Sequence, residues 1–335
     1  MKAYRIHRLN GLDGLALDDL PRPKPGPGEV SIRVRAVALN YRDLLVAKGV
    51  YSRNLPLPLI PTSDGAGEII EVGAGVTRFA TGDRVAGCFF SDWADGPPSE
   101  AAAKTALGGA VDGMLVEEKV LPASGIVKIP DHLSFEEAAT LPCAALTAWH
   151  GLIESGGLKA GETVLVQGTG GVSLFALQFA LLAGTRVLAI SSRDDKLDRA
   201  RAMGASDGVN YKTTPDWGPV VRDLAGGLGV DHIVEVGGAG TLGQSLKAVK
   251  VGGHVALIGV LTGGGEVNPT PILMRNIRVQ GIYVGSRGMF EAMNRAIALH
   301  QLKPIIDRVF PFEQAREAYA HLESGTHFGK VVIAV

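Results

Sequence analysis

The strongest constraint on the fold is a short glycine-rich turn between a predicted strand and a predicted helix. The strand over 163–167 (TVLVQ) runs directly into Gly168-Thr-Gly-Gly-Val-Ser173, and a helical stretch follows over 171–183. Glycines at these positions permit a tight turn and let the backbone approach a pyrophosphate, while the start of the helix offers N–H groups and partial positive charge. The pattern predicts dinucleotide binding by Gly168, Thr169, Gly170, Gly171 and Val172.

This turn has one alternative interpretation, and it departs from the usual motif at one position. The glycines could serve only a tight strand-to-helix turn, although the strand and helix on either side give the context in which the pattern carries meaning. The third small position is Ser173 instead of glycine, which we expect to loosen the contact between helix and strand slightly without abolishing it.

Strands and helices alternate after residue 134. Ser134 and Glu137 match a capping box that opens a helical stretch. Each later strand is a short, continuous run of Val, Ile and Leu, as expected when helices cover both faces of a parallel sheet. The alternation therefore predicts a doubly wound α/β (Rossmann) domain. Its expected strands are 163–167, 186–190, 232–236 and 254–258, and its expected helices are 171–183, 194–203 and 241–249.

The first part of the chain has a different sequence pattern, which is typical of β-strands. Residues 30–36 alternate as VSIRVRA, the period-2 pattern of a half-buried strand, and short apolar runs broken by Gly and Pro follow. This predicts a β-rich barrel or sandwich over 1–125. Helices over 290–300 and 312–322 and a strand over 330–335 are expected near the end. A chain of 335 residues is also longer than one hydrophobic core usually supports, so two domains are expected.

Composition excludes several classes of function. The formal net charge of -1 lacks the basic surface of a nucleic-acid-binding protein. Two cysteines, Cys88 and Cys143, cannot form a disulfide framework or a multi-cysteine zinc knuckle. The first residues lack the apolar core of a signal peptide, and the longest apolar stretch, 172–183, is too short to span a bilayer. We therefore expect a cytoplasmic protein with no membrane or nucleic-acid partner.

The end of the next predicted strand bears on the choice of cofactor. NAD-binding sites normally place Asp or Glu there to accept from the ribose 2′-OH, whereas this chain continues as Ser191-Ser192-Arg193. Ser191 removes a charge that would repel a 2′-phosphate, and Arg193 and Lys196 supply positive charge. Asp194 and Asp195 are contrary evidence, so NAD(H) stays the alternative. The pattern favours NADP(H), bound by Ser191, Ser192, Arg193 and Lys196.

Three further segments carry a family resemblance. They are Ala38-Leu-Asn-Tyr-Arg-Asp43 with Lys48-Gly-Val-Tyr51, Pro61-Thr-Ser-Asp-Gly-Ala-Gly67 with Gly82-Asp-Arg-Val85, and the closing Gly329-Lys-Val-Val332. With the glycine turn, they resemble the zinc-independent, quinone oxidoreductase-like branch of the medium-chain dehydrogenase/reductase superfamily. The resemblance implies a GroES-like catalytic domain over 1–125 and 284–335, a Rossmann domain over 126–283, and a homo-oligomer, either dimer or tetramer.

The resemblance also implies further cofactor contacts. It places Thr147 and the backbone of five residues near the nicotinamide, Tyr211 near the adenosine, and Lys330 on the pyrophosphate. Each also has a plainer interpretation, as an ordinary helix residue, a surface aromatic or a solvated strand-end charge. The five residues that would line the nicotinamide are Ile258, Gly259, Val260, Ile282 and Val284.

The zinc-using relatives hold their catalytic metal with Cys, His and a second Cys. This chain has Asn40 and Ser63 at the first two positions and keeps only Cys143 at the third. Zinc needs about three protein ligands drawn from thiolate, imidazole or carboxylate, and adjacent Asp64 does not complete such a set. The segment 89–114 also lacks the cysteines of a structural zinc lobe. We therefore expect no metal, with Cys143 a buried small hydrophobe.

Without a Lewis acid, the chemistry shifts from alcohol oxidation towards reduction of a quinone or a conjugated carbonyl. Hydrogen-bond donors then stabilise the charge on the substrate oxygen, and Tyr51, Tyr41 and Asn40 are the candidates. Tyr51 is the first choice, although it could be only a packing aromatic. The alternatives are an alcohol dehydrogenase with an unexpected metal and an NADPH-binding protein of little catalysis, such as a redox sensor or lens-type protein. The sequence does not name the substrate.

Overall fold

The protein is described by a computed structural model that covers residues 1–52 and 54–335. The chain forms two compact units: Met1–Leu146 together with Gly285–Val335, and Thr147–Val284. The chain first passes from one unit to the other within helix α4 (Leu146–Trp149). The π-helical segments Leu141–Ala145 and His150–Glu154 flank this helix. The two-domain α/β prediction is therefore confirmed.

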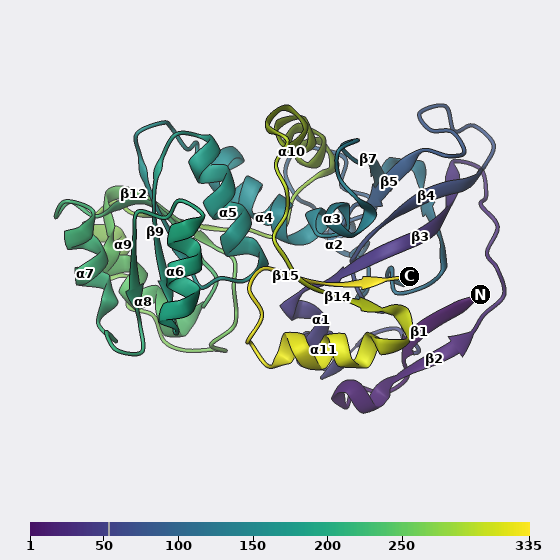
Figure 1. Ribbon diagram of the computed structural model, residues 1–335, viewed down its shortest axis with the longest axis horizontal. Coiled ribbons are helices and arrows are strands. Elements are labelled where there is room, and N and C mark those ends of the chain that lie inside the picture. Colours follow the sequence, from purple (N-terminus) through teal and green to yellow (C-terminus); the bar gives the residue numbers. More distant parts are fainter. Residues whose placement is uncertain (53) are drawn as a thin grey trace. The chain divides into compact units, whose positions relative to one another are not determined.

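The second unit is a parallel sheet with helices on both faces. Its strand order within the described chain is β10-β9-β8-β11-β12-β13, and every neighbouring pair is parallel. Figure 1 shows α5 and α6 on one side of this sheet and α7, α8 and α9 on the other. This is the doubly wound order of a Rossmann domain. The strands are β8 (Thr163–Gln167), β9 (Arg186–Ser191), β10 (Asp207–Asn210), β11 (Val230–Glu235), β12 (Val249–Leu257) and β13 (Arg278–Gly281). The helices are α5 (Gly171–Leu182), α6 (Asp194–Ala202), α7 (Trp217–Leu224), α8 (Ala239–Ala248) and α9 (Thr270–Met274).

The core of this unit follows from the apolar strand runs. Leu165, Leu188, Ile233 and Val255 come from four neighbouring strands and pack into one buried cluster. Helix α5 is apolar nearly all round, because the sheet covers one side and the helical segment containing Trp149 contacts Phe179 on another. Burial of these side chains is the main term that stabilises the sheet.

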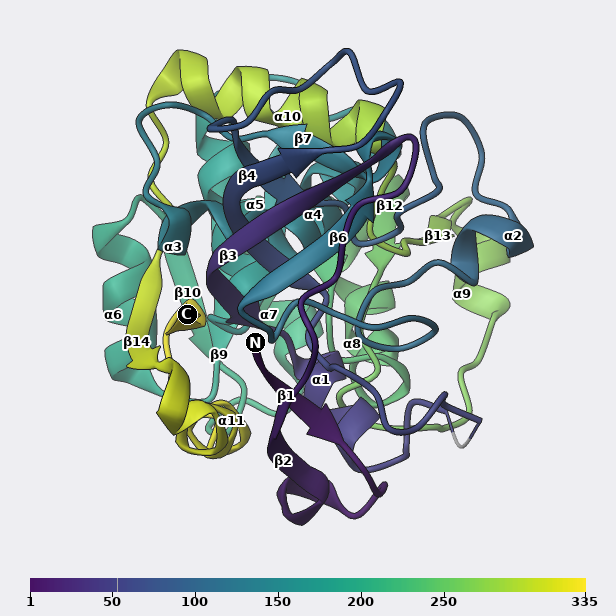
Figure 2. The same ribbon diagram turned by 90° about the vertical axis from the view of Figure 1, so that its right-hand side faces the viewer.

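The first unit is built on a mostly antiparallel sheet. Its order is β14-β15-β3-β4-β5-β7, with β6 also pairing β3, and β1 and β2 form a separate hairpin. Figure 2 shows α10 beside β7 at one end of the unit and α11 beside β14 at the other. The strands are β1 (Lys2–Ile6), β2 (Leu15–Asp19), β3 (Glu29–Leu39), β4 (Asp64–Val72), β5 (Arg84–Gly87), β6 (Glu118–Pro122), β7 (Ile126–Lys128), β14 (Ile306–Pro311) and β15 (Lys330–Ala334). The helices are α1 (Tyr41–Ala47), α2 (Glu100–Ala103), α3 (Phe135–Ala138), α10 (Arg287–His300) and α11 (Ala315–Glu323).

The boundary between units differs from the expected position. The prediction divided the chain at residue 126, whereas residues 126–146 belong to the first unit. The reason is strand pairing: β7 bonds to β5, and α3 packs on β3 and β4. The predicted capping box of Ser134 and Glu137 is present and opens α3.

None of the described helices is both long and apolar enough to cross a membrane.

Candidate dinucleotide site and candidate active site

The glycine turn lies where the strand order of the parallel sheet reverses. Strand β8 neighbours β9 on one side and β11 on the other, so the chain leaves the carboxyl end of β8 at the switch point where open α/β sheets bind ligands. Gly168 has a φ of 72°, which explains glycine there. A Cβ added at Gly170 would meet nothing within 4 Å. The chain's own packing therefore does not require that glycine, whereas close approach of a ligand would.

Helix α5 begins directly after this turn without a side-chain cap. Its N-cap is Gly170, which has no side chain to accept a hydrogen bond from the first turn of the helix. The opening N–H groups of a helix have no partner within it, and their dipole favours an anion. A phosphate group fits this helix start.

Ser173 does not loosen the helix as expected. Its side chain is buried, and its Oγ donates to the carbonyl of Gln167 at 2.5 Å. Because Gln167 is the last residue of β8, this bond ties the first turn of α5 to the end of the strand.

A carboxylate that the sequence analysis missed organises the neighbouring strand end. Glu235 is the last residue of β11 and is fully buried. Its Oε1 accepts from the amides of Gly237 and Gly238 at 2.8 and 3.0 Å. Its Oε2 accepts from Gln167 Nε2 at 2.7 Å and from the Ser245 hydroxyl. Glu235 thus joins the ends of β8 and β11. An acidic residue inside an apolar run before Gly-Gly was the available sequence signal.

The residues predicted to select NADP(H) over NAD(H), the cofactor selector, are Ser191, Ser192, Arg193 and Lys196, and they lie at and just after the end of β9. Ser191 is buried, and its carbonyl accepts from the amide of Tyr211, so these two predicted residues are adjacent. Arg193 is exposed, and its Nε and Nη2 donate to the two carboxylate oxygens of Asp195 at 2.8 and 3.0 Å. Asp195, which the sequence analysis counted against NADP(H), therefore binds the guanidinium group that was predicted to contact a 2′-phosphate. Ser192 and Lys196 lie in the same stretch, with Lys196 largely buried in the first turn of α6.

The predicted nicotinamide-lining residues gather around the carboxyl ends of β12 and β13. Ile258 and Gly259 follow β12, and their amides donate to the carbonyl of Glu235. A Cβ at Gly259 would lie 1.5 Å from Val236 O, so only glycine fits. Ile282 follows β13, and its amide donates to Leu257 O.

The other predicted residues here differ in exposure and conformation. Val284 is buried with a φ of 53°, a strained conformation for a β-branched residue, and its carbonyl contacts His150 Nδ1 at 2.7 Å. Val260 is largely exposed, whereas Thr147 is buried in α4.

A second polar cluster lies in the first unit, where three neighbouring strands meet. Strand β3 runs antiparallel to both β15 and β4, so its end lies beside their beginnings. This places Asn40, just after β3, beside Lys330 at the start of β15 and Asp64 at the start of β4. Lys330 Nζ donates to Asn40 Oδ1 and to the carbonyl of Leu39, both at 2.6 Å, and lies 3.9 Å from Asp64 Oδ2.

The carboxylate of Asp64 is fully buried in this cluster. It accepts from Ser63 Oγ at 2.7 Å and from the amide of Cys143 at 3.1 Å. Burial raises the pKa of Asp64, opposed by the charge of Lys330 and by hydrogen bonds. Burial likewise raises the pKa of the Cys143 thiol, and the nearby Asp64 carboxylate adds to the shift. Asn40, Ser63 and Cys143, which stand where relatives have zinc ligands, therefore all contact the pair formed by Lys330 and Asp64.

The aromatic candidates lie on and after helix α1. Tyr41 and Tyr51 are 43% and 38% exposed. The guanidinium of Arg42 lies 5.1 Å from the ring centre of Tyr51, and its Nη1 donates to Leu107 O at 2.7 Å. Asp43 is fully buried and accepts from the amide of Asn40 at 2.8 Å, which fixes the start of the helix. Burial raises the pKa of Asp43 to about 6, opposed by Arg42.

Comparison with known proteins bears on both units. Residues 26–131 match the alcohol dehydrogenase GroES-like domain, and residues 171–299 match the zinc-binding dehydrogenase family. A zinc-type alcohol dehydrogenase-like protein of Schizosaccharomyces pombe is 46% identical over 99% of both chains. The chain belongs to the medium-chain dehydrogenase/reductase superfamily.

Other members of this superfamily have related names. The quinone oxidoreductase of Homo sapiens is 29% identical over 99% of this chain and 97% of its own length. The crystal structure of an NAD-dependent alcohol dehydrogenase is 38% identical, with a TM-score of 0.91 over all of both chains. The present chain is therefore an oxidoreductase in a superfamily of nicotinamide-dependent dehydrogenases, with the GroES-like and Rossmann domains of that superfamily.

Proposed function

We propose that this oxidoreductase uses NADPH to reduce a quinone or an α,β-unsaturated carbonyl and works without zinc. The observation that carries the proposal is the ammonium group of Lys330 among the positions that would hold the metal. Asn40 Oδ1 accepts from Lys330, and Ser63 Oγ donates to Asp64. Neither offers the thiolate or imidazole that zinc needs, and the Cys143 thiol has a raised pKa. These residues do not suit a zinc ion.

The residues of the chain then have three tasks. The glycine turn and the start of α5 hold the pyrophosphate, and the residues after β12 and β13 orient the nicotinamide, which supplies the hydride. Negative charge collects on the substrate oxygen as a conjugated carbon is reduced, and Tyr51, Tyr41 and Asn40 are the proposed donors to that oxygen. Water can deliver the proton, so no side-chain acid is essential.

Preference for NADPH is supported by the selector at the end of β9. Ser191 places no charge beside the 2′-oxygen, and Arg193 lies two residues further on. Introducing a carboxylate by Ser191→Asp should weaken NADPH binding more than NADH binding, because only NADPH carries the phosphate. Fluorescence titration with both cofactors tests this, and equal loss for the two would contradict the selector.

The deciding experiment is NADPH oxidation against a panel of quinones, enones, aldehydes and alcohols, with NADH as the control. We expect turnover of quinones or enones, unchanged after dialysis against a chelator. Tight NADPH binding with no turnover on any electrophile would instead favour a binding protein with little catalysis.

An alcohol dehydrogenase is the second candidate, favoured by the names of the Schizosaccharomyces pombe relative and the 38% identical structure. It predicts activity on alcohols or aldehydes that chelation abolishes. Metal analysis of the purified protein, alongside the chelator test, separates it from our proposal.

We also propose that the protein is a homo-oligomer. Strand β13 lies at an edge of the parallel sheet, and an edge strand can pair with a second copy. Exposed apolar side chains gather on α9 and after β12, where Leu273 and Met274 are 80% and 75% exposed and Val260 and Leu261 are also exposed. Light scattering during gel filtration measures the mass, and Leu273→Glu should shift it towards the monomer.

A further inference from the structure

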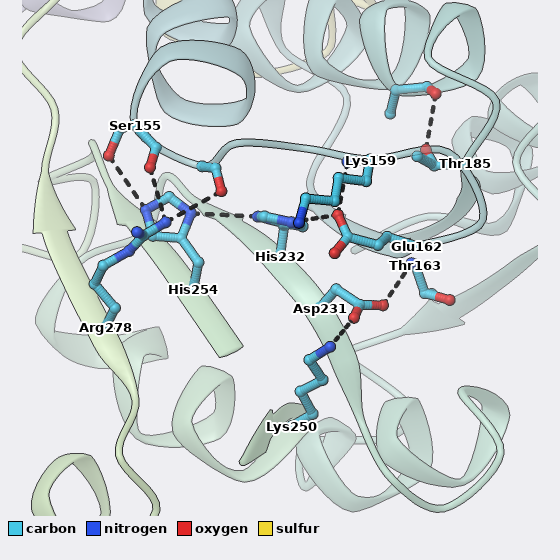
Figure 3. Close-up of polar contacts among 12 residues, drawn as sticks. Ser155, Lys159, Glu162, Thr163, Thr185, Asp231, His232, Lys250, His254 and Arg278 are labelled. Atoms are coloured by element: carbon cyan, nitrogen blue, oxygen red, sulfur yellow. Dashed lines mark hydrogen bonds and ion pairs between the residues drawn. The ribbon is translucent and has the colours of Figure 1, made fainter. Parts of the chain in front are cut away.

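A polar cavity lies at the end of the parallel sheet opposite to the glycine turn. Its volume is about 580 Å³. His232, His254 and Arg278 lie in register on β11, β12 and β13. His232 and Arg278 are near the amino ends of their strands, and His254 is in the second half of β12. All three line the cavity, together with Glu162 from the turn before β8. Figure 3 shows the histidines side by side, between Ser155 and Glu162.

Hydrogen bonds fix the protonation of the first histidine. His232 Nε2 lies 2.9 Å from Glu162 Oε2. A carboxylate only accepts, so this nitrogen carries the proton and Nδ1 of the neutral ring has a lone pair. That Nδ1 faces Nδ1 of His254 at 3.4 Å.

The second histidine is anchored in a similar way. His254 Nε2 lies 3.4 Å from the hydroxyl oxygen of Ser155. A hydroxyl can donate or accept, so either nitrogen of His254 can carry the proton. The 3.4 Å contact between the rings is a hydrogen bond when His254 Nδ1 carries the proton. Moving that proton to Nε2, where the Ser155 hydroxyl oxygen accepts it, leaves both Nδ1 lone pairs facing the gap between the rings. Both rings are buried, which disfavours the charged imidazolium form.

The separation of the two nitrogens matches metal coordination. Zinc binds imidazole nitrogen at about 2.05 Å, and two such bonds with their nitrogens 3.4 Å apart enclose about 110°, close to the tetrahedral angle. The bond from His232 to Glu162 is also the arrangement that orients metal-binding histidines.

The charges around the cavity limit which metal can bind. Arg278 donates to the carbonyls of Ser155 and Gly156 at 2.8 and 3.1 Å, and Lys250 pairs with Asp231. Lys159 and Glu162 complete the charged residues of the lining, giving three cations and two carboxylates. The two carboxylates already hold partners in the protein, and this scarcity of oxygen ligands disfavours Ca²⁺ and Mg²⁺. Imidazole ligands instead suit Cu²⁺, Ni²⁺ and Zn²⁺.

We propose that His232 and His254 form a two-imidazole site for a divalent transition-metal ion, bound through Nδ1 of each ring. Glu162 and Ser155 orient the two rings, and solvent in the cavity completes the coordination. No group of three or more His, Cys, Asp or Glu among the described residues could hold a metal, so this site has two protein ligands. We therefore expect an affinity in the micromolar range, about that of an exchangeable site and far below a structural zinc site.

The test uses tag-free protein stripped with a chelator and titrated with Cu²⁺ at pH 7.5 in a non-coordinating buffer. Calorimetry should give one equivalent bound to the wild type, and electron paramagnetic resonance should show coupling to two imidazole nitrogens. His232→Gln and His254→Gln should each weaken binding at least about tenfold. Glu162→Gln should weaken it about tenfold, because an amide oxygen is a weaker acceptor than a carboxylate and leaves the His232 ring less basic. Zn²⁺ should raise the melting temperature of the wild type more than that of either histidine variant.

The matched control is His321→Gln. His321 also bonds a carboxylate, Asp307, at 2.8 Å, but it lies in the other unit and should leave binding unchanged. The proposal is overturned if the wild type binds no Cu²⁺, or if both histidine variants bind it like the wild type. If a histidine variant does not fold, the resonance spectrum of the wild type decides, because coupling to fewer than two imidazole nitrogens contradicts the site.

Discussion

Arg193 and Asp195 make a two-bonded ion pair at the position that would distinguish the two cofactors. A 2′-phosphate must compete with Asp195 for this guanidinium. Replacing Asp195 by Asn removes the competing charge, so we expect the KM for NADPH to fall about three- to tenfold and the KM for NADH to change little. Initial rates with both cofactors measure the effect.

Asp198→Asn provides the control for this prediction. Asp198 lies on the same helix and pairs with Arg201 at 2.7 Å, so its replacement removes an equal charge away from the selector. A similar gain in NADPH affinity for both variants would show a general charge effect and not a specific competition.

Lys330 has two possible roles that kinetics can separate. The family resemblance predicts a pyrophosphate contact, whereas the structure holds Lys330 at 3% exposure against Asn40 and Leu39. If the ammonium positions Asn40, Lys330→Met should lower kcat at least about tenfold and change the KM for NADPH less than twofold. A rise in the cofactor KM at constant kcat would favour the pyrophosphate contact.

The same substitution should also destabilise the first unit. Without Lys330, the buried carboxylate of Asp64 loses its cation, which costs about 3 kcal/mol or more. Adding Asp64→Asn should restore much of the lost unfolding free energy, because the uncompensated charge is then gone. Denaturant unfolding of the single and double variants measures the coupling.

At the scale of elements, Glu235 connects the ends of β8 and β11 beside the glycine turn. Glu235→Gln replaces one carboxylate oxygen by an NH₂ group. Whichever way the amide turns, one pair of donors loses its acceptor, either the glycine amides or the donors from Gln167 and Ser245, and we expect a cost of about 3 kcal/mol of unfolding free energy. NADPH binding should weaken as well, because the turn loses its support from β11. Glu266→Gln, at an exposed loop position, is the control, and equal stability of the two variants would contradict the prediction.

The elements that the sequence predicted are those with strong local signals. The turn from β8 to α5 and the strands β9, β11 and β12 follow from apolar runs and glycines, and the structure confirms them. Strand β13 (RVQG) was missed because it is four residues long, polar and at an edge. The Lys330 cluster could not be predicted from local signals, because Lys330 and Asn40 lie 290 positions apart and only strand pairing brings them together.

At the scale of the whole molecule, each unit has a buried titratable group, and the two groups change the unfolding free energy in opposite directions as the pH falls. In the second unit, His254 is held neutral with a pKa of about 4, below its ordinary value of 6.5, by burial and by the charge of Arg278. In the first unit, burial raises the pKa of Asp43 from 3.8 to about 6. Each shift makes the stability of its unit depend on pH.

The two signs differ. Below pH 6.5 the unfolded chain protonates His254 and the folded unit does not, so the unfolding free energy of the second unit falls as the pH drops from 6.5 towards 4. Asp43 binds its proton more tightly in the folded unit, so its contribution is fully present below about pH 3.8 and is lost as the pH rises through 6. Acidification from pH 7.5 to 5 should therefore weaken the second unit relative to the first.

Calorimetry at pH 7.5 and 5, with hydrogen exchange to assign each transition to a unit, measures this difference. We expect the melting transition of the second unit to move to lower temperature at pH 5 and the two transitions to separate. His254→Gln should reduce this movement, because glutamine does not titrate, whereas Asp43→Asn should alter only the pH response of the first unit. An unchanged response of the second unit in His254→Gln would show that another group governs its acid sensitivity.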